Sequence, residues 1–409
     1  MSSNDTVIGL RLDPLDVLFF RDGRPFEEST RASSGLPYPQ TLAGALRTAL
    51  LMQVGFDFSK FSAELRKKRQ AGVLDPVNAL QELRAVLEAM HAPGWVIDAR
   101  FRGPWLALFD ENGSVSPLLP VPWTLFRLDE GRGNVNGERW LRADPWEKGL
   151  PGWDPPCENL LPLWHRGSAD AKRPGGFLTP DGIGCFLRGG VPSDDHWLRE
   201  EHLFAFDART GIAVDRDTFT AQEHMLYTVN LLALKPRIDT DRVGIGGRKV
   251  GLYCEVIPPS GTKHELSARL PTLMHFGGEG RYVTMKEVDA YNWRGLSESA
   301  GAPPQARKMW LLATPGLFHD GNGKSDWRPN RLAEHLRAAA SGNPVAVSGW
   351  DIARCCPKPT RFAVPAGSVY FTDGVNRLDN GSLCDDAEDI AQGWGFALQG
   401  VWPNGNAKN

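Results

Sequence analysis

The chain has 409 residues, of which 41% are hydrophobic and 23% charged, and its formal net charge at pH 7 is −3. This length exceeds what one small hydrophobic core needs and predicts two domains, while the ordinary composition excludes a mainly disordered chain. The acidic balance excludes a protein that coats nucleic acid with its whole surface, although local basic regions can still bind it.

The first residues lack a basic segment followed by an apolar run, so the sequence shows no secretory signal. Apolar stretches such as 226–234 are far shorter than the roughly 20 residues that cross a bilayer. We therefore expect a cytoplasmic protein without a membrane partner. The six cysteines include no Cys-x-x-Cys pair, which predicts reduced, buried side chains and no metal site or cofactor.

The N-terminal part shows alternating strand and helix signals. Residues 7–20 read as a strand broken at Pro14, and a loop rich in Arg, Ser and Gly follows. Residues 39–53 predict a helix, because Leu42, Leu46 and Leu50 recur at helical spacing. Further helices are expected over 58–70 and 75–90, and one bent strand or two short strands over 95–110.

Residues 128–200 lose this periodicity and are rich in Gly, Pro and Trp, which predicts a long irregular insertion. Four tryptophans stand outside obvious elements and suggest a surface for partner proteins: Trp140, Trp146, Trp153 and Trp164. Regular patterns return at 201, with strand-like runs near 225–234, 251–259, 308–318, 344–352 and 361–371 and helices near 329–340 and 385–392.

This succession is typical of an α+β protein built from ferredoxin-like βαββαβ units. We expect an N-terminal domain over 1–200, which includes the insertion, and a C-terminal domain over 201–409. Such a fold hosts many functions, so function has to come from individual residues.

Glycine-rich loops are the first candidates for a binding site. GIGGRKVG at 244–251 resembles a dinucleotide fingerprint but has Lys249 at its third glycine position and no strand-turn-helix context. HFGGEGRY at 275–282 combines three glycines with Arg281. Its exposed backbone N–H groups could hold a phosphate, or the glycines could only make a tight turn.

Motifs for metal or nucleophilic chemistry are incomplete. DGNGKSDWRPN at 320–330 lacks the glycine and glutamate of a calcium loop, and KHELSARL at 263–270 lacks the second histidine of a zinc motif. A general acid–base pair from His224 and His275 is conceivable, but with nine histidines in the chain, core or surface histidines are the better explanation. We assign no catalytic residue and no metal ligand.

An ordered series of stretches resembles one family, the third subunit of the Cmr complex, a RAMP-superfamily protein of type III-B CRISPR interference complexes. The resemblance covers nearly the whole chain, with 128–175 matching only vaguely. It is carried by DPLDVLFFRDGRPF at 13–26, TLAGALRTALL at 41–51, GFLTPDGI at 176–183, RTGIAVDRDTFTAQEHMLYTV at 209–229, GGEGR at 277–281 and VPAGSVYF at 364–371.

The resemblance implies two ferredoxin-like domains that face each other and a role other than hydrolysis. Such a subunit holds the repeat-derived 5′ handle of the CRISPR RNA and docks the large polymerase-like subunit and the first backbone subunit of the Cmr filament. GWGFALQGVW at 393–402 falls where RAMP proteins carry a C-terminal glycine-rich loop, but it lacks basic residues, which argues against a phosphate contact there.

Single-stranded RNA offers unstacked bases and a charged backbone, so its holder needs arginine forks, backbone N–H groups and aromatic surfaces. The candidates are Arg21, Arg24, Arg31, Arg47, Arg209, Arg216, Gly277, Gly278, Gly280 and Arg281, with Phe20 and Phe26 beside the first group. Asp215 and Asp217 could orient the arginines or simply form a turn. The basic run RKKR at 66–69 is expected to be a solvated helical face.

Two other functions remain open from the sequence. One is a metal-independent endoribonuclease of the RAMP type that trims CRISPR RNA with His224 or His275 as general base. The other is a sugar- or nucleotide-modifying enzyme, which only the glycine-rich loops support.

Overall fold

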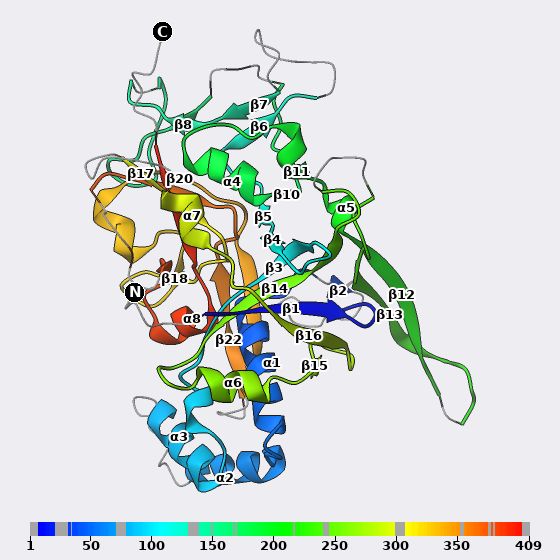
Figure 1. The fold of residues 1–409 in the computed structure, drawn as a ribbon. Coiled ribbons are helices and arrows are strands. Elements are labelled where there is room, and N and C mark those ends of the chain that lie inside the picture. The colour runs from blue at the N-terminus through cyan, green and yellow to red at the C-terminus, as the bar shows by residue number, and fades with distance from the viewer. Residues whose placement is uncertain are drawn as a thin grey trace.

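A computed structural model shows a mixed α+β protein with several antiparallel sheets (Figure 1). It describes residues 7–20, 32–33, 35–70, 79–129, 139–148, 150–165, 167, 170–215, 217–239, 245–298, 307–351, 356–374, 378 and 381–402. The α-helices in this part of the chain are α1 (Pro39–Met52), α2 (Phe58–Gln70), α3 (Ala79–Ala89), α4 (Pro180–Leu187), α5 (Glu200–Leu203), α6 (Lys263–Arg269), α7 (Trp293–Glu298) and α8 (Ala387–Gln392). Short 3₁₀ helices span Gly94–Val96, Asp194–His196 and Asn330–His335. None of the described helices is long and apolar enough to cross a membrane.

A six-stranded sheet with the order β15-β16-β1-β14-β3-β4 forms the first layer. Its strands are β1 (Ile8–Pro14), β3 (Arg100–Phe109), β4 (Val115–Pro117), β14 (Lys249–Ile257), β15 (Leu273–His275) and β16 (Tyr282–Val288). If β1, β3, β14 and β16 are numbered one to four along the chain, their spatial order is 4-1-3-2, and all neighbours are antiparallel. Helix α1 precedes the second of these strands and α6 precedes the fourth.

One face of this sheet is covered by α1 and α6. Leu42 and Leu46 of α1, both fully buried, pack with Leu10 of β1 and Leu266 of α6 in one core. The apolar residues on α1 recur every three or four positions, which places them on the side that meets the sheet. Pro39 stands in the first turn of α1, where its missing N–H leaves no helical bond unmade.

A second, four-stranded sheet has the order β20-β23-β17-β24. Its strands are β17 (Lys308–Leu312), β20 (Leu336–Ala340), β23 (Val369–Thr372) and β24 (Ala397–Val401), and helix α8 lies between the last two along the chain. Numbered in chain order, these strands also follow 4-1-3-2 and are also antiparallel. Both sheets therefore have the same strand order.

The two sheets meet through a shared core. Trp105 of β3 and Tyr253 of β14 belong to the same buried cluster as Met309 of β17 and Phe371 of β23. The indole N–H of Trp105 donates a 2.8 Å hydrogen bond to the backbone carbonyl of Ala313. This packing fixes one half of the first sheet against the second sheet.

A buried polar cluster lies at the same junction. Glu255 of β14 is 1% exposed and accepts hydrogen bonds from Tyr253 Oη at 2.9 Å and Trp293 Nε1 at 2.8 Å, while Arg102 Nη1 lies 3.4 Å from its other oxygen. Burial raises the pKa of Glu255, whereas Arg102 and the two hydrogen bonds favour its charged form. The Arg102 guanidinium also lies over Phe396, 4.8 Å from the ring centre.

The region predicted as an irregular insertion contains short strands and helices that pack on the second sheet. Its strands are β7 (Trp140–Arg142), β8 (Asp144–Pro145), β9 (Leu163–Trp164), β10 (Phe177–Leu178) and β11 (Trp197–Leu198), and they form two-stranded and three-stranded sheets that also include β5 (Leu119–Pro120) and β6 (Leu125–Arg127) from the preceding segment. The expectation of a tryptophan surface is wrong for Trp140, which is 4% exposed and donates a 2.7 Å hydrogen bond to Asp194. Trp153 and Trp164 are 44% and 50% exposed.

A long hairpin, β12 (Phe204–Val214) and β13 (Ala221–Leu234), projects from the body of the molecule (Figure 1). The short strand β2 (Ala32–Ser33) runs parallel to β13 beside Val229 and Asn230. Two further hairpins are β18 (Phe318–His319) with β19 (Ser325–Asp326), and β21 (Val345–Asp351) with β22 (Cys356–Ala363).

Most predicted elements are present with shifted boundaries, and one is of another type. The helix expected over 329–340 is a 3₁₀ helix followed by β20, because 336–340 pairs with β23 in the second sheet. Strands β14 and β16 follow residue 200 but pair with β1 and β3. The expected domain boundary at 200 therefore does not coincide with a division between the sheets.

Candidate nucleic-acid interface

The GGEGR segment forms the tight turn between β15 and β16. The N–H of Phe276 donates a 2.8 Å hydrogen bond to the carbonyl of Arg281, which closes the loop. Gly277 and Gly280 have φ values of +94° and +63°, in the left-handed region that favours glycine, and Glu279 also has a positive φ of 55°. The backbone conformation of the turn is therefore sufficient to account for Gly277 and Gly280, whether or not the loop binds a ligand.

The same loop packs against Phe19 and Phe20, which follow strand β1 in the chain. Gly278 N–H donates a 2.9 Å hydrogen bond to the carbonyl of Phe19, and a Cβ at Gly277 would lie 2.5 Å from that oxygen. Phe20 contacts Phe276 edge to face, with ring centres 5.0 Å apart. A Cβ at Gly280 would meet nothing within 4 Å, so the outer side of the loop is open to an approaching ligand.

Arg281 is held at the edge of this loop. Its Nη1 lies 3.2 Å from Oδ2 of Asp16, and the two side chains are 23% and 62% exposed. The Nε of Arg281 is buried without a hydrogen-bond partner among the described residues. The Asp16 carboxylate therefore orients the guanidinium of Arg281, and other N–H donors of the guanidinium do not bind this carboxylate.

Arg21, Arg24 and Arg31 lie outside the described residues, but the points where their segment leaves and rejoins the fold are described. Phe20, the last residue before it, accepts a 3.4 Å hydrogen bond from the N–H of Gly35. Strand β2, next to Arg31 in sequence, lies against β13. The described residues on either side of the arginine segment therefore lie beside the GGEGR loop and strand β13.

Arg47 occupies a structural position within α1. Its Nη2 donates hydrogen bonds to the carbonyls of Ile97 and Ala99, at 3.2 and 3.4 Å, and its guanidinium lies 5.3 Å from the ring centre of Phe101. Burial lowers the pKa of Arg47. These contacts tie α1 to the start of β3, and an RNA contact by Arg47 stays a prediction.

The long hairpin carries the remaining arginines of the predicted set. Arg209 pairs with Asp207 on the same strand at 2.8 Å, and both are exposed, whereas Arg216 lies outside the described residues. Asp215 accepts hydrogen bonds from the N–H groups of Asp217 and Thr218, at 3.0 and 2.8 Å, at the tip of the hairpin. Asp215 thus acts as a turn carboxylate.

A groove that the sequence did not reveal lies between the end of β1 and the base of the hairpin. Its volume is about 360 Å³, and it is lined by Arg11, Asp13, Pro14, Leu15, Asp16, Val17, Ala233, Leu234, Lys235, Pro236, Lys249 and Val250. Lys249 ends the basic stretch at 242–249 and Lys235 belongs to no predicted basic run, and the two come together only through the fold. In the sequence, only the alternation of polar and apolar residues along the strands could have indicated the surface that lines this groove.

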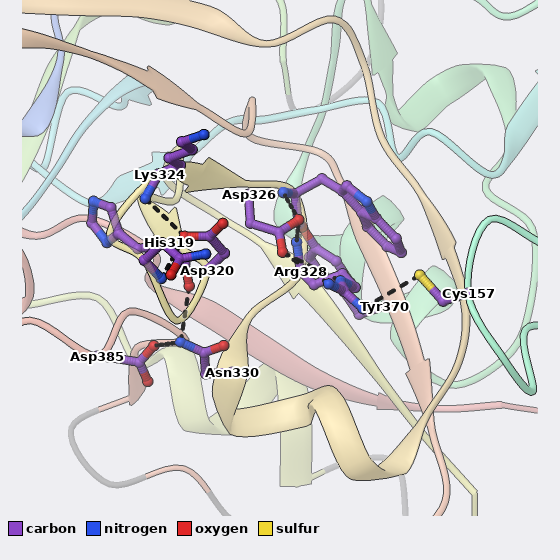
Figure 2. A network of polar contacts seen from close by, with 11 residues as sticks. Cys157, His319, Asp320, Lys324, Asp326, Arg328, Asn330, Tyr370 and Asp385 are labelled. Carbon is purple, nitrogen blue, oxygen red and sulfur yellow. Dashed lines mark hydrogen bonds and ion pairs between the residues drawn. The ribbon is translucent and has the colours of Figure 1, made fainter.

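The remaining motifs have structural roles. In Figure 2, the Asp320 carboxylate accepts hydrogen bonds from the N–H groups of Asn322 and Lys324, at 2.9 Å each, which makes the 320–324 segment a tight turn between β18 and β19. In the GIGGRKVG segment, strand β14 begins at Lys249, where a dinucleotide fingerprint would continue as a helix. Among the described residues, no group of three His, Cys, Asp or Glu side chains could hold a metal ion.

The histidines of the nuclease alternative do not form a described pair. His275 is exposed on β15 and contacts the ring of Tyr282 edge to face at 5.3 Å. The side chain of His224 lies outside the described part of the structure. At the C-terminal glycine segment, a Cβ at Gly393 would lie 2.7 Å from the carbonyl of Phe101, so this turn faces the protein interior.

A comparison with protein families gives one decisive match. The family model described as "CRISPR-associated protein (Cas_Cmr3)" matches residues 10–402. The chain belongs to the Cmr3 family. The resemblance drawn from the ordered motifs is thereby confirmed, and the chain is a Cmr3-family subunit of a type III CRISPR effector complex.

Three solved structures that are similar to this Cmr3-family chain are chains of type III CRISPR complexes. A chain of the type III-B Cmr-beta complex bound to cognate target RNA and AMPPnP is 18% identical, with a TM-score of 0.47, over 89% of this chain and 86% of that one. A chain of the Cmr-beta complex bound to cognate target RNA is 19% identical, with a TM-score of 0.47, over 90% and 86%. A chain of the type III-A Csm3–Csm4 subcomplex is 10% identical, with a TM-score of 0.40, over 96% and 98%. No curated protein matches the chain.

Proposed function

We propose that this Cmr3-family chain is a non-catalytic scaffold that holds the 5′ repeat-derived handle of the CRISPR RNA. In this role it also docks the large polymerase-like subunit and the first backbone subunit of the Cmr filament. Membership of the Cmr3 family supports the proposal. The matching strand order of the two sheets further supports the inference that both are ferredoxin-like units of the RAMP type.

One observation carries the RNA-binding part of the proposal. The GGEGR loop packs on Phe19 and Phe20, immediately before the segment that contains Arg21, Arg24 and Arg31. Two sequence stretches more than 200 residues apart are thereby joined at one surface. Backbone N–H groups and arginine forks are part of the chemistry that recognises a single RNA strand. The rings of Phe19 and Phe20, 8% and 5% exposed, are buried and support the loop without offering a stacking surface.

Arg281 fits the role of the loop's cation. A guanidinium can donate two parallel hydrogen bonds to a phosphate, and its present partner, Asp16, is an exposed carboxylate that a phosphate could displace. Exposed ion pairs contribute little stability, so this exchange would cost the fold little.

The experiment is photocrosslinking of CRISPR RNA in the assembled complex, followed by mass spectrometry. We expect crosslinked peptides from 15–31 and 273–286 and none from the basic helix α2. In parallel, the purified protein is incubated with repeat RNA without metal. Specific cleavage in the repeat would establish the endoribonuclease instead, and crosslinks confined to α2 would refute the RNA site proposed for the loop.

A further inference from the structure

The second face of the six-stranded sheet is covered over only part of its width. On β3 and β14 this face presents Trp105 and Tyr253, which are buried against the second sheet. On β1, β16 and β15 the same face carries exposed side chains, since residues of alternate parity on these strands are buried on the other side. We call the exposed part the open face, defined by Leu15, Leu273, His275, Tyr282, Thr284 and Lys286.

The open face has an aromatic and apolar row next to the GGEGR loop. His275 pairs with Tyr282 across β15 and β16, and the N–H of Leu15 donates a 3.1 Å hydrogen bond to the carbonyl of Tyr282. Tyr282, Leu273 and Leu15 are 44%, 47% and 61% exposed. Tyr282 directly follows Arg281 in sequence, so the row begins where the loop ends.

The row leads into the groove beside β1. Leu15 belongs to both, and the far wall of the groove contributes Lys235 and Lys249, which are exposed. The groove and the loop therefore lie at two ends of one surface, with the rings of Tyr282 and His275 between them.

The charges around this surface favour a polyanion. Its five cations are Arg11, Lys235, Lys249, Arg281 and Lys286, and its three carboxylates are Asp13, Asp16 and Glu279, so its formal charge is positive in a chain whose net charge is −3. Exposed rings between cations suit a nucleic-acid strand, because bases stack on the rings while the cations meet phosphates. A protein partner would meet the same rings but would leave the lysines without anionic partners unless it were acidic.

We propose that the open face is a stacking surface for single-stranded RNA that leaves the GGEGR loop. Tyr282 stacks an unpaired base, and His275 supports the Tyr282 ring edge to face. Lys235 and Lys249 contact the backbone of the following nucleotides in the groove. This inference rests on the proposed function and adds to it the direction of the strand and the residues that hold its bases.

The test uses the assembled complex with CRISPR RNA containing 4-thiouridine. We expect crosslinks to His275 or Tyr282 and weaker RNA binding by about fivefold or more for Tyr282→Leu, the loss typical of one stacked base. Tyr282→Phe retains the ring and should bind within about twofold of the wild type. Lys249→Ala should lower the salt slope of binding by about 0.7.

Matched controls separate stacking from general surface effects. Phe362 on β22 is 49% exposed, so Phe362→Leu should leave RNA binding unchanged, and Lys67→Ala, at a side chain 76% exposed, should leave the salt slope unchanged. Crosslinks at 277–281 combined with wild-type binding by Tyr282→Leu would overturn the stacking surface and leave the proposed function intact. Absence of crosslinks from the whole of 15–31 and 273–286 would overturn both. Loss of the large subunit from RNA-free Tyr282→Leu complexes, with RNA affinity unchanged, would make the open face a protein interface.

Discussion

The covered and the open parts of one sheet face show how the same surface can serve two purposes. On the covered part, Trp105 and Tyr253 are buried, and the one carboxylate, Glu255, is satisfied by three donors. On the open part, Tyr282 and Leu15 remain exposed, and the cations stand at the rim. Aromatic residues occur on both parts, so composition does not distinguish them.

The difference lies in whether polar groups are satisfied within the chain. Burial of Glu255 requires Arg102, Tyr253 and Trp293 together, because an unpaired charge in the core costs several kcal/mol. Lys235 and Lys249 are exposed to water and need no partner to be stable. A surface that combines exposed rings with such cations can exchange water for a ligand, whereas the covered part can only hold the two sheets together.

The largest effect is expected from Glu255→Ala. This change leaves Arg102 buried without its carboxylate and removes the acceptor of Tyr253 and Trp293, so unfolding should become easier by about 3–5 kcal/mol. The measurement is urea unfolding of the purified protein. Glu287→Ala, at an exposed carboxylate on the same sheet, should stay within about 0.5 kcal/mol of the wild type.

The next largest effect concerns the glycine loop at the border of the open face. Gly277→Ala places a Cβ against the Phe19 carbonyl at a φ of +94°, which should destabilise the fold by about 2 kcal/mol or more. Gly280→Ala meets no neighbour within 4 Å and carries only the conformational cost of its positive φ, about 1 kcal/mol. Thermal unfolding ranks the two, and reduced RNA retention by folded Gly280→Ala protein would identify the loop as a ligand cradle. Unchanged retention would make it a structural turn.

Arg47→Ala tests whether a predicted RNA contact is structural. The loss of its hydrogen bonds to Ile97 and Ala99 should lower stability by about 1.5 kcal/mol, as is typical for hydrogen bonds from charged groups. RNA retention by the folded fraction should not change. If Arg47→Ala instead lowers the salt slope of RNA binding and leaves the stability of the fold unchanged, Arg47 contacts RNA.

The smallest effect on stability is expected from Arg281→Ala, whose ion pair with Asp16 is partly exposed and contributes no more than about 1 kcal/mol. Its effect on RNA is larger: the salt slope should fall by about 0.7, and Arg281→Lys should restore the slope without restoring the fork geometry. Arg21→Ala should behave in the same way. Salt titration of RNA binding by the complex measures both, and an unchanged slope for both variants would exclude phosphate contacts here.

The sequence predicted the elements whose apolar pattern is local. Helix α1 follows the spacing of Leu42, Leu46 and Leu50, and helix α8 was expected close to its observed bounds. A helix was expected near 329–340, and the RAAA run at 337–340 does have high helix propensity, but pairing with β23 makes 336–340 a strand. Local propensity carries no information about such a distant partner.

The candidate site was predictable only in part for the same reason. The GGEGR loop and the arginine segment are recognisable in the sequence as glycine and arginine clusters. The structure places the loop against Phe19, two residues before Arg21. Lys235 belongs to no motif, whereas Lys249 and Tyr282 stand in the glycine-rich stretches 244–251 and 275–282. Only the fold, which places strands far apart in the chain side by side, brings the three residues onto one surface. Arg47 shows a different case: its hydrogen bonds to Ile97 and Ala99 could not be read from the sequence, and its predicted RNA contact stays a prediction.

The position of β1 in its sheet has a consequence for synthesis. Both of its neighbours, β14 and β16, lie more than 200 residues further along the chain, so β1 has exposed backbone edges until residue 288 has left the ribosome. Pairings of such large sequence separation form slowly, and unpaired strand edges promote aggregation in the meantime. A chain truncated near residue 200 would lack both neighbours of its first strand, so the six-stranded sheet can be completed only after residue 288 has been translated.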